Sequence, residues 1–166
     1  MRRALIAALL LASVLVQVTW APRIAVAGVF PNLALVFVIA IAWTTGVRSG
    51  MAWACVAGLM LDLTAPGALG PHALALLAGA YVTGFWSRNL DSKSLLHPAL
   101  ASAVSTALYS LVLVGADEFL DLPTPAFGIA VQLVLAASAY NAVLMPAAVL
   151  VVRTLNAPAP RPAELA

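Results

Sequence analysis

Long apolar runs separated by short polar gaps are the main pattern of this chain. The runs are rich in Ala, Leu and Val, and most are close to the length of about 20 residues that a membrane-spanning helix needs. They do not alternate apolar with polar residues, as the strands of a membrane barrel do. The pattern predicts an all-α polytopic membrane protein with six transmembrane helices, at residues 4–20, 23–48 (apolar centre 33–43), 50–64, 71–87, 95–116 and 127–152.

The gaps between the predicted helices are short and contain turn residues. Residues 65–70 read Ala-Pro-Gly-Ala-Leu-Gly, and residues 117–126 include two prolines, which oppose continuation of a helix. No polar stretch is long enough for a second, soluble domain. We expect one transmembrane domain over residues 1–153 and a short, disordered cytoplasmic tail over 154–166, which is rich in Pro and Ala.

Composition supports the membrane interpretation. Hydrophobic residues make up 64% of the chain and charged residues 8%, whereas a soluble domain has roughly 45–50% apolar and about 25% charged residues. A soluble domain of this length cannot bury so much apolar surface. The net charge of +2 does not indicate nucleic acid as a partner, because basic residues beside spans are the ordinary membrane pattern.

The basic residues predict how the chain is threaded. With six spans and both termini inside, seven of the eight basic residues lie on the inner side: Arg2, Arg3, Arg48, Arg88, Lys93, Arg153 and Arg161. Only Arg23 lies outside, which is a strong positive-inside bias. We therefore expect a multi-pass protein of the bacterial cytoplasmic membrane. One alternative is a cleaved signal peptide ending at Ala25-Val26-Ala27, which leaves five spans.

Asp62 is the one clear acid within a predicted span. It follows Arg48 by 14 residues, or roughly 21 Å of helix, so it lies within the outer part of an apolar core about 30 Å thick. Such residues usually face the bundle interior. The turn at 65–70 lets His72 meet Asp62, and Asn32 is expected near the outer end of the second span, where it is also a candidate helix N-cap.

Asp62, His72 and Asn32 are therefore candidates for an outer pocket or a partner contact. The alternative is structural: a hydrogen bond between helices, or an acid at a helix end that reaches water. Asp62 also ends a row of small residues, whose spacing brings helix backbones close together. The predicted packing face comprises Gly50, Ala54, Gly58, Gly79 and Thr83. We interpret two further rows of polar residues as packing contacts. The first row is Ser102, Ser105, Thr106 and Tyr109, and the second is Ser138 and Asn141.

The sequence contains no recognisable catalytic, cofactor or metal motif. It has no phosphate-binding glycine loop, no nucleophile elbow and no paired cysteines, and its two histidines lie 25 residues apart. A membrane enzyme acting on lipid-linked precursors needs a second acid or a basic cluster within the membrane. We therefore expect no enzymatic activity, no catalytic residue, no cofactor and no metal.

Several short segments together resemble one known family. They are Gly58-Leu59-Met60-Leu61-Asp62-Leu63, Pro66-Gly67-Ala68-Leu69-Gly70 with His72 after it, Gly79-Ala80-Tyr81-Val82-Thr83-Gly84, and Pro31-Asn32-Leu33. In this combination the chain resembles the MreD family of bacterial rod shape-determining membrane proteins over nearly its whole length. One departure is Asn32, where the family usually has an acid.

The resemblance implies a non-enzymatic scaffold of the cell-elongation (rod) complex that supports lateral peptidoglycan synthesis. Its implied partners are MreC by direct contact, then MreB, a RodA-type glycosyltransferase and a penicillin-binding transpeptidase, with membrane lipid around it. The family is also similar in fold to the substrate-binding subunits of energy-coupling-factor transporters, so a vitamin-binding subunit is the alternative function. Such a subunit should have several polar and aromatic groups converging on an outer pocket, and this chain offers few.

Overall fold

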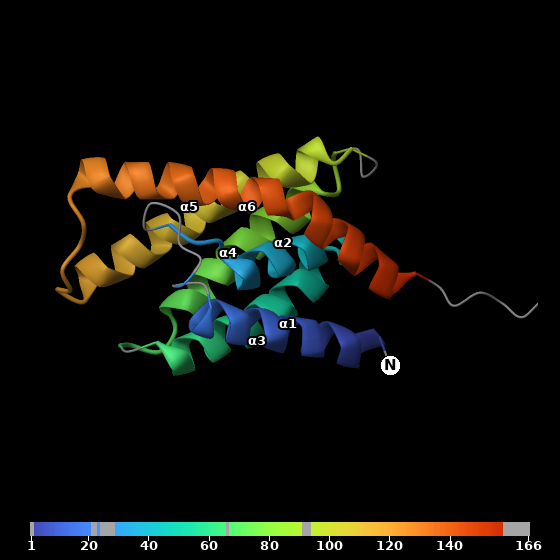
Figure 1. Ribbon diagram of the computed structural model, residues 1–166, viewed down its shortest axis with the longest axis horizontal. Coiled ribbons are helices and arrows are strands. Elements are labelled where there is room, and N and C mark those ends of the chain that lie inside the picture. The colour runs from blue at the N-terminus through green and yellow to red at the C-terminus, as the bar shows by residue number, and fades with distance from the viewer. Residues whose placement is uncertain (1, 21–22, 24–28, 66, 91–93, 158–166) are drawn as a thin grey trace, which may run out of the picture.

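The computed structural model describes residues 2–20, 23, 29–65, 67–90 and 94–157. Within these residues the chain forms six α-helices and no strand, so the all-α prediction is confirmed (Figure 1). The helices are α1 (Arg2–Thr19), α2 (Leu33–Thr45), α3 (Val47–Thr64), α4 (Pro71–Trp86), α5 (Leu96–Phe119) and α6 (Phe127–Asn156).

Each predicted span contains one helix, with shifted ends. The second helix is short because Asn32 caps it at one end and Gly46, with a φ of 90°, ends it at the other. α6 continues to Asn156, beyond the boundary expected at residue 153, and residues 158–166 of the expected tail lie outside the described residues. The possible cleavage site at 25–27 also lies outside them.

The helices differ in how well they suit a bilayer. Only α5 and α6, among the described residues, are both long and apolar enough to cross a membrane on their own; α1 and α2 are apolar but shorter. At 1.5 Å per residue, the 30 residues of α6 span about 45 Å. Large side chains on α5 and α6, including Leu111, Phe119, Phe127 and Val143, are exposed, which suits a lipid environment.

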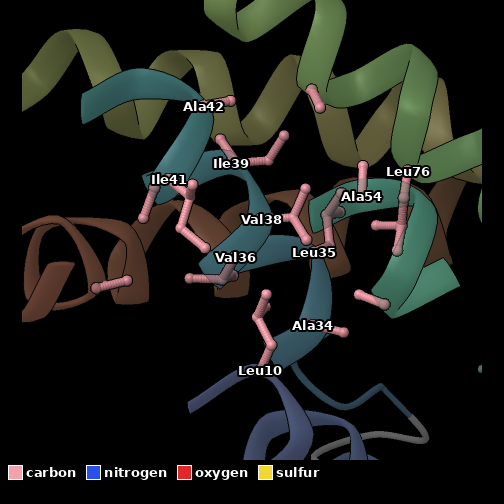
Figure 2. Packing of buried hydrophobic residues seen from close by; sticks show 14 of the residues in the cluster. Leu10, Ala34, Leu35, Val36, Val38, Ile39, Ile41, Ala42, Ala54 and Leu76 are labelled. Atoms are coloured by element: carbon pink, nitrogen blue, oxygen red, sulfur yellow. The ribbon is translucent and has the colours of Figure 1, made fainter. Parts of the chain in front are cut away.

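α2 lies at the centre of the bundle and contacts each of the other five helices. Nine of its 13 residues are buried, as expected for a helix that is apolar on every side. Figure 2 shows Leu35, Val36, Val38 and Ile39 within this core. Leu10 of α1, Ala54 of α3 and Leu76 of α4 belong to the same cluster.

The bundle has two distinct ends. α1 begins and α6 ends at one of them, which we call the terminal end (Figure 1). The turn at residues 67–70 and the connection at 120–126 lie at the opposite end, which we call the turn end (Figure 1). An even number of helices, threaded up and down, produces this arrangement.

Candidate functional site

Asp62 lies in the last turn of α3, directly beside the start of α4. The turn between the two helices ends at Gly70, whose φ of 119° is a conformation that side chains other than glycine rarely adopt. Gly70 is the N-cap of α4 and Pro71 is its first residue, a position that proline favours. Glycine has no side chain, so the N-cap residue itself offers no capping bond.

The carboxylate of Asp62 supplies the missing cap from the neighbouring helix. Its Oδ1 accepts a hydrogen bond from the backbone N–H of His72 at 2.9 Å, and its Oδ2 accepts one from Ala73 at 3.1 Å. These are the second and third residues of α4, whose N–H groups an N-cap side chain ordinarily satisfies. The helix dipole also favours a negative charge at this end. Asp62 is 2% exposed, so this buried acid has a structural explanation.

His72 adds a side-chain contact to the same carboxylate. Its Nδ1 lies 3.0 Å from Asp62 Oδ1, and its side chain is 27% exposed. The ring also makes an edge-to-face contact with Tyr109 of α5, with 6.1 Å between ring centroids. This geometry is favourable for an aromatic pair. Asp62 and His72 are therefore in direct contact, and they connect α3 and α4 to α5.

Asn32 is connected to this group through Tyr109. The side chain of Asn32 accepts a hydrogen bond from Leu35 N–H at 2.9 Å, which confirms its role as the N-cap of α2, and it also interacts with the Tyr109 side chain. The backbone N–H of Asn32 donates to Oδ1 of Asn141 at 2.9 Å. All three sequence candidates, Asp62, His72 and Asn32, thus belong to one group.

Asn141 extends the group to α6. Its Nδ2 donates to Thr106 Oγ1 of α5 at 3.0 Å, and Asn141 is fully buried. We call this connected set the polar cluster: Asp62, His72, Tyr109, Asn32, Asn141 and Thr106. It joins five of the six helices, all except α1.

Residues of the small-residue face lie where helices come into close contact. A side chain on Gly50 would overlap Ala42 of α2, and one on Gly58 would overlap the backbone of Ala73 in α4. Ala54, between them, is fully buried. On α4, Gly79 packs near Ser105 of α5, and the hydroxyl of Thr83 lies 2.8 Å from that of Ser105.

The chemistry that the polar cluster can perform is limited by its own contacts. Both oxygens of Asp62 are occupied by N–H groups of α4 and by His72. No group of three metal-binding side chains occurs among the described residues. The arrangement caps helices and fixes their mutual positions.

Sequence inspection missed two parts of this picture. The sequence pattern predicts only packing roles for Tyr109 and Asn141, whereas in the structure Tyr109 connects Asn32 to His72, and Asn141 connects Asn32 to Thr106. Asn32 and Asn141 are 109 residues apart, so no local motif indicates their contact. A second polar site, at the terminal end, combines Arg3, Arg48 and Asn156. The gathering of Arg2, Arg3 and Arg48 on the predicted inner side was the only sign of it.

Three features together define the class of this protein as an all-helical membrane protein. They are the central apolar helix, the exposed apolar flanks of α5 and α6, and the internal polar cluster. Residues 1–155 match the family model described as rod shape-determining protein MreD, and the chain belongs to that family. Its role is therefore in rod shape determination, at the membrane. Neither a curated protein nor a solved structure matches the chain.

Proposed function

We propose that this protein is a six-span, non-enzymatic scaffold of the cell-elongation complex in the bacterial cytoplasmic membrane, and that it binds MreC directly. Membership of the MreD family is the observation that carries the proposal. Through MreC it acts with MreB, a RodA-type glycosyltransferase and a penicillin-binding transpeptidase to support lateral peptidoglycan synthesis.

The arrangement of the helices supports six spans with both termini in the cytoplasm. The start of α1 and the end of α6 share the terminal end (Figure 1). Arg3 and Arg48 lie at that end around one pocket, and basic residues favour the cytoplasmic side. α2 and α4 have 13 and 16 residues. Such short helices are compatible with spanning, since backbone that is buried in protein need not be shielded from lipid.

The internal contacts favour a scaffold over a small-molecule carrier. A vitamin-binding subunit needs polar groups that are free to bind its substrate, whereas the polar groups of Asp62 and Asn32 bond to helix N-termini. These contacts fix the relative positions of the helices. A rigid bundle with an exposed apolar flank on α5 and α6 is suited to holding a partner helix in the membrane.

Copurification with MreC tests the proposal. The tagged protein and MreC are coexpressed, extracted in mild detergent and isolated on the tag, with an unrelated tagged multi-pass protein as the control. We expect MreC to remain with this protein and not with the control. If MreC is extracted in soluble form and is absent from the isolated protein, direct binding is wrong.

A further inference from the structure

A pocket of about 640 Å³ opens at the terminal end of the bundle, away from the polar cluster. It is formed where the start of α1, the start of α3 and the end of α6 come together. Its lining includes Arg3 and Ile6 of α1, Arg48, Ser49 and Trp53 of α3, and Asn156 of α6. Nothing in the proposed scaffold function accounts for this combination of residues.

The pocket carries two positive charges that no residue in the described part of the chain neutralises. Arg3 and Arg48 are exposed, and within the described residues neither guanidinium has a hydrogen bond or an ion pair. None of the acids that the structure describes lines the pocket. Two unpaired guanidinium groups at one pocket favour an anion, and the planar guanidinium matches a phosphate group well.

Neutral donors add to this preference. Nδ2 of Asn156 is buried and has no hydrogen-bond partner among the described residues, although a buried donor normally has one. The N-cap of α3 is Gly46, which offers no side-chain capping bond, and the first turn of α3 contributes Arg48 and Ser49 to the pocket. The uncapped N–H groups of a helix start also favour an anion.

Most of the remaining wall of the pocket is apolar, with Thr45 as the polar exception. Ile6 lies one turn inside Arg3, and Trp53 lies five residues inside Arg48, or about 7.5 Å along the helix. A bare phosphate ion or an acidic peptide gains nothing from contact with this apolar surface, whereas a lipid acyl chain packs favourably against it. Trp is also common at the level of lipid headgroups.

We propose that this pocket binds the phosphate headgroup of an anionic phospholipid, with Arg3, Arg48 and the Asn156 amide on the phosphate and Ile6 and Trp53 against the first part of an acyl chain. Basic pockets between membrane helices are known to hold such headgroups. The assignment to the cytoplasmic leaflet rests on the proposed topology. The proposed binding of the lipid does not depend on that topology.

The test uses the purified full chain in an uncharged detergent, titrated with short-chain phosphatidylglycerol and followed by native mass spectrometry. The probes for comparison are phosphatidylcholine of equal chain length, inorganic phosphate and a hexaglutamate peptide. We expect saturable binding of phosphatidylglycerol that is at least ten times tighter than that of each comparison probe. Tighter binding of inorganic phosphate or of the peptide would assign the pocket to that ligand and overturn the lipid proposal.

Matched variants locate the binding. Arg48→Gln and Arg3→Gln should each weaken phosphatidylglycerol binding roughly five-fold, from about 1 kcal/mol per basic residue, and the double variant about 25-fold. Arg88→Gln is the control, because it removes an exposed charge outside the pocket, and it should leave binding unchanged. If Arg88→Gln weakens binding as much as Arg48→Gln, the attraction is diffuse and the pocket proposal is wrong.

Folding and function are separated from binding by two further readouts. Both arginine side chains are exposed, so each variant should unfold at the wild-type temperature when no lipid is added. Copurification with MreC is measured on the same preparations. Loss of lipid binding in the variants, with MreC retained, supports the pocket. Absence of MreC from the wild-type preparation, with its lipid binding intact, counts against the scaffold proposal alone.

Discussion

Asp62 shows how one buried charge can be explained by its immediate surroundings. A carboxylate inside a membrane protein is costly, and here three hydrogen-bond contacts from His72 and Ala73 offset that cost. The need arises because the N-cap position of α4 is a glycine. An acid on the preceding helix therefore performs the task that an Asp or Ser at residue 70 ordinarily performs.

We expect Asp62→Ala to destabilise the protein by about 2 kcal/mol or more, because it leaves the N–H groups of His72 and Ala73 without an acceptor. Asp62→Asn keeps one acceptor oxygen and should show a smaller loss. Thermal unfolding in detergent, followed by circular dichroism, measures both. Thr64→Ala is the control: it lies in the same helical turn, is exposed, and bonds only to the carbonyl of Leu61. Equal stability of Asp62→Ala and Thr64→Ala would contradict the capping role.

The same substitution has a cellular consequence. We expect cells that rely on the Asp62→Ala protein to lose rod shape although the protein still inserts, because the α3–α4 pair is no longer held in place. Microscopy measures the shape, and an immunoblot of the membrane fraction measures the amount of protein. Normal rods at wild-type protein levels would limit Asp62 to local packing.

Asn141 and Ser138 provide a matched pair on α6. Asn141 accepts from Asn32 N–H and donates to Thr106, whereas the buried hydroxyl of Ser138 has no partner among the described residues. Asn141→Ala should therefore cost about 1–3 kcal/mol, since it leaves the N–H of Asn32 without an acceptor and removes one of the two hydrogen bonds of the Thr106 hydroxyl, which keeps its bond to the carbonyl of Ser102. Ser138→Ala should be neutral or slightly stabilising. The unfolding midpoints of the two variants decide this. A loss of similar size in both would mean that side-chain volume, and not hydrogen bonding, sets the stability here.

At the scale of helices, glycines determine how closely the elements pack. The Gly58 position has no room for a side chain because the backbone of Ala73 lies against it, while Gly115 of α5 has open space around it. Gly58→Ala should destabilise the protein by about 1–3 kcal/mol through overpacking. Gly115→Ala should leave the free energy of unfolding unchanged or raise it by about 0.5–1 kcal/mol, since alanine favours a helix. Unfolding of both variants under one detergent condition tests the contrast, and a stable Gly58→Ala protein would contradict the close packing of α3 on α4.

The helices themselves were largely predictable, and the contacts among them only in part. Each apolar run is bounded by a charge or by Pro and Gly, so the six helices follow from the sequence, with shifted ends. Asp62 and His72 are separated by one turn, and the close α3–α4 pair brings them together. The contact between Asn32 and Asn141 depends on how α6 packs on α2, and a single sequence contains no signal for that packing.

At the scale of the whole molecule, the two ends of the bundle differ in the polar groups that they carry. The polar cluster and the turn of α3 and α4 occupy one part of the bundle, and the arginine pocket occupies the terminal end. α5 and α6 are the longest helices, and their exposed apolar side chains give the bundle an apolar flank on one side. In the proposed topology, the terminal end faces the cytoplasm and the turn end faces outward.

This topology makes a direct prediction about access from each side of the membrane. Cys55 is the single cysteine, so Cys55→Ser gives a background for placing new cysteines. Thr124→Cys, in the connection between α5 and α6, should react with a membrane-impermeant maleimide in intact cells. Ser94→Cys, between α4 and α5, should react only after the cells are opened, because the basic residues near it favour the cytoplasm. A mass shift on the isolated protein measures both. The opposite pattern would reverse the orientation, and labelling of both sites in intact cells would mean that α5 does not cross the membrane.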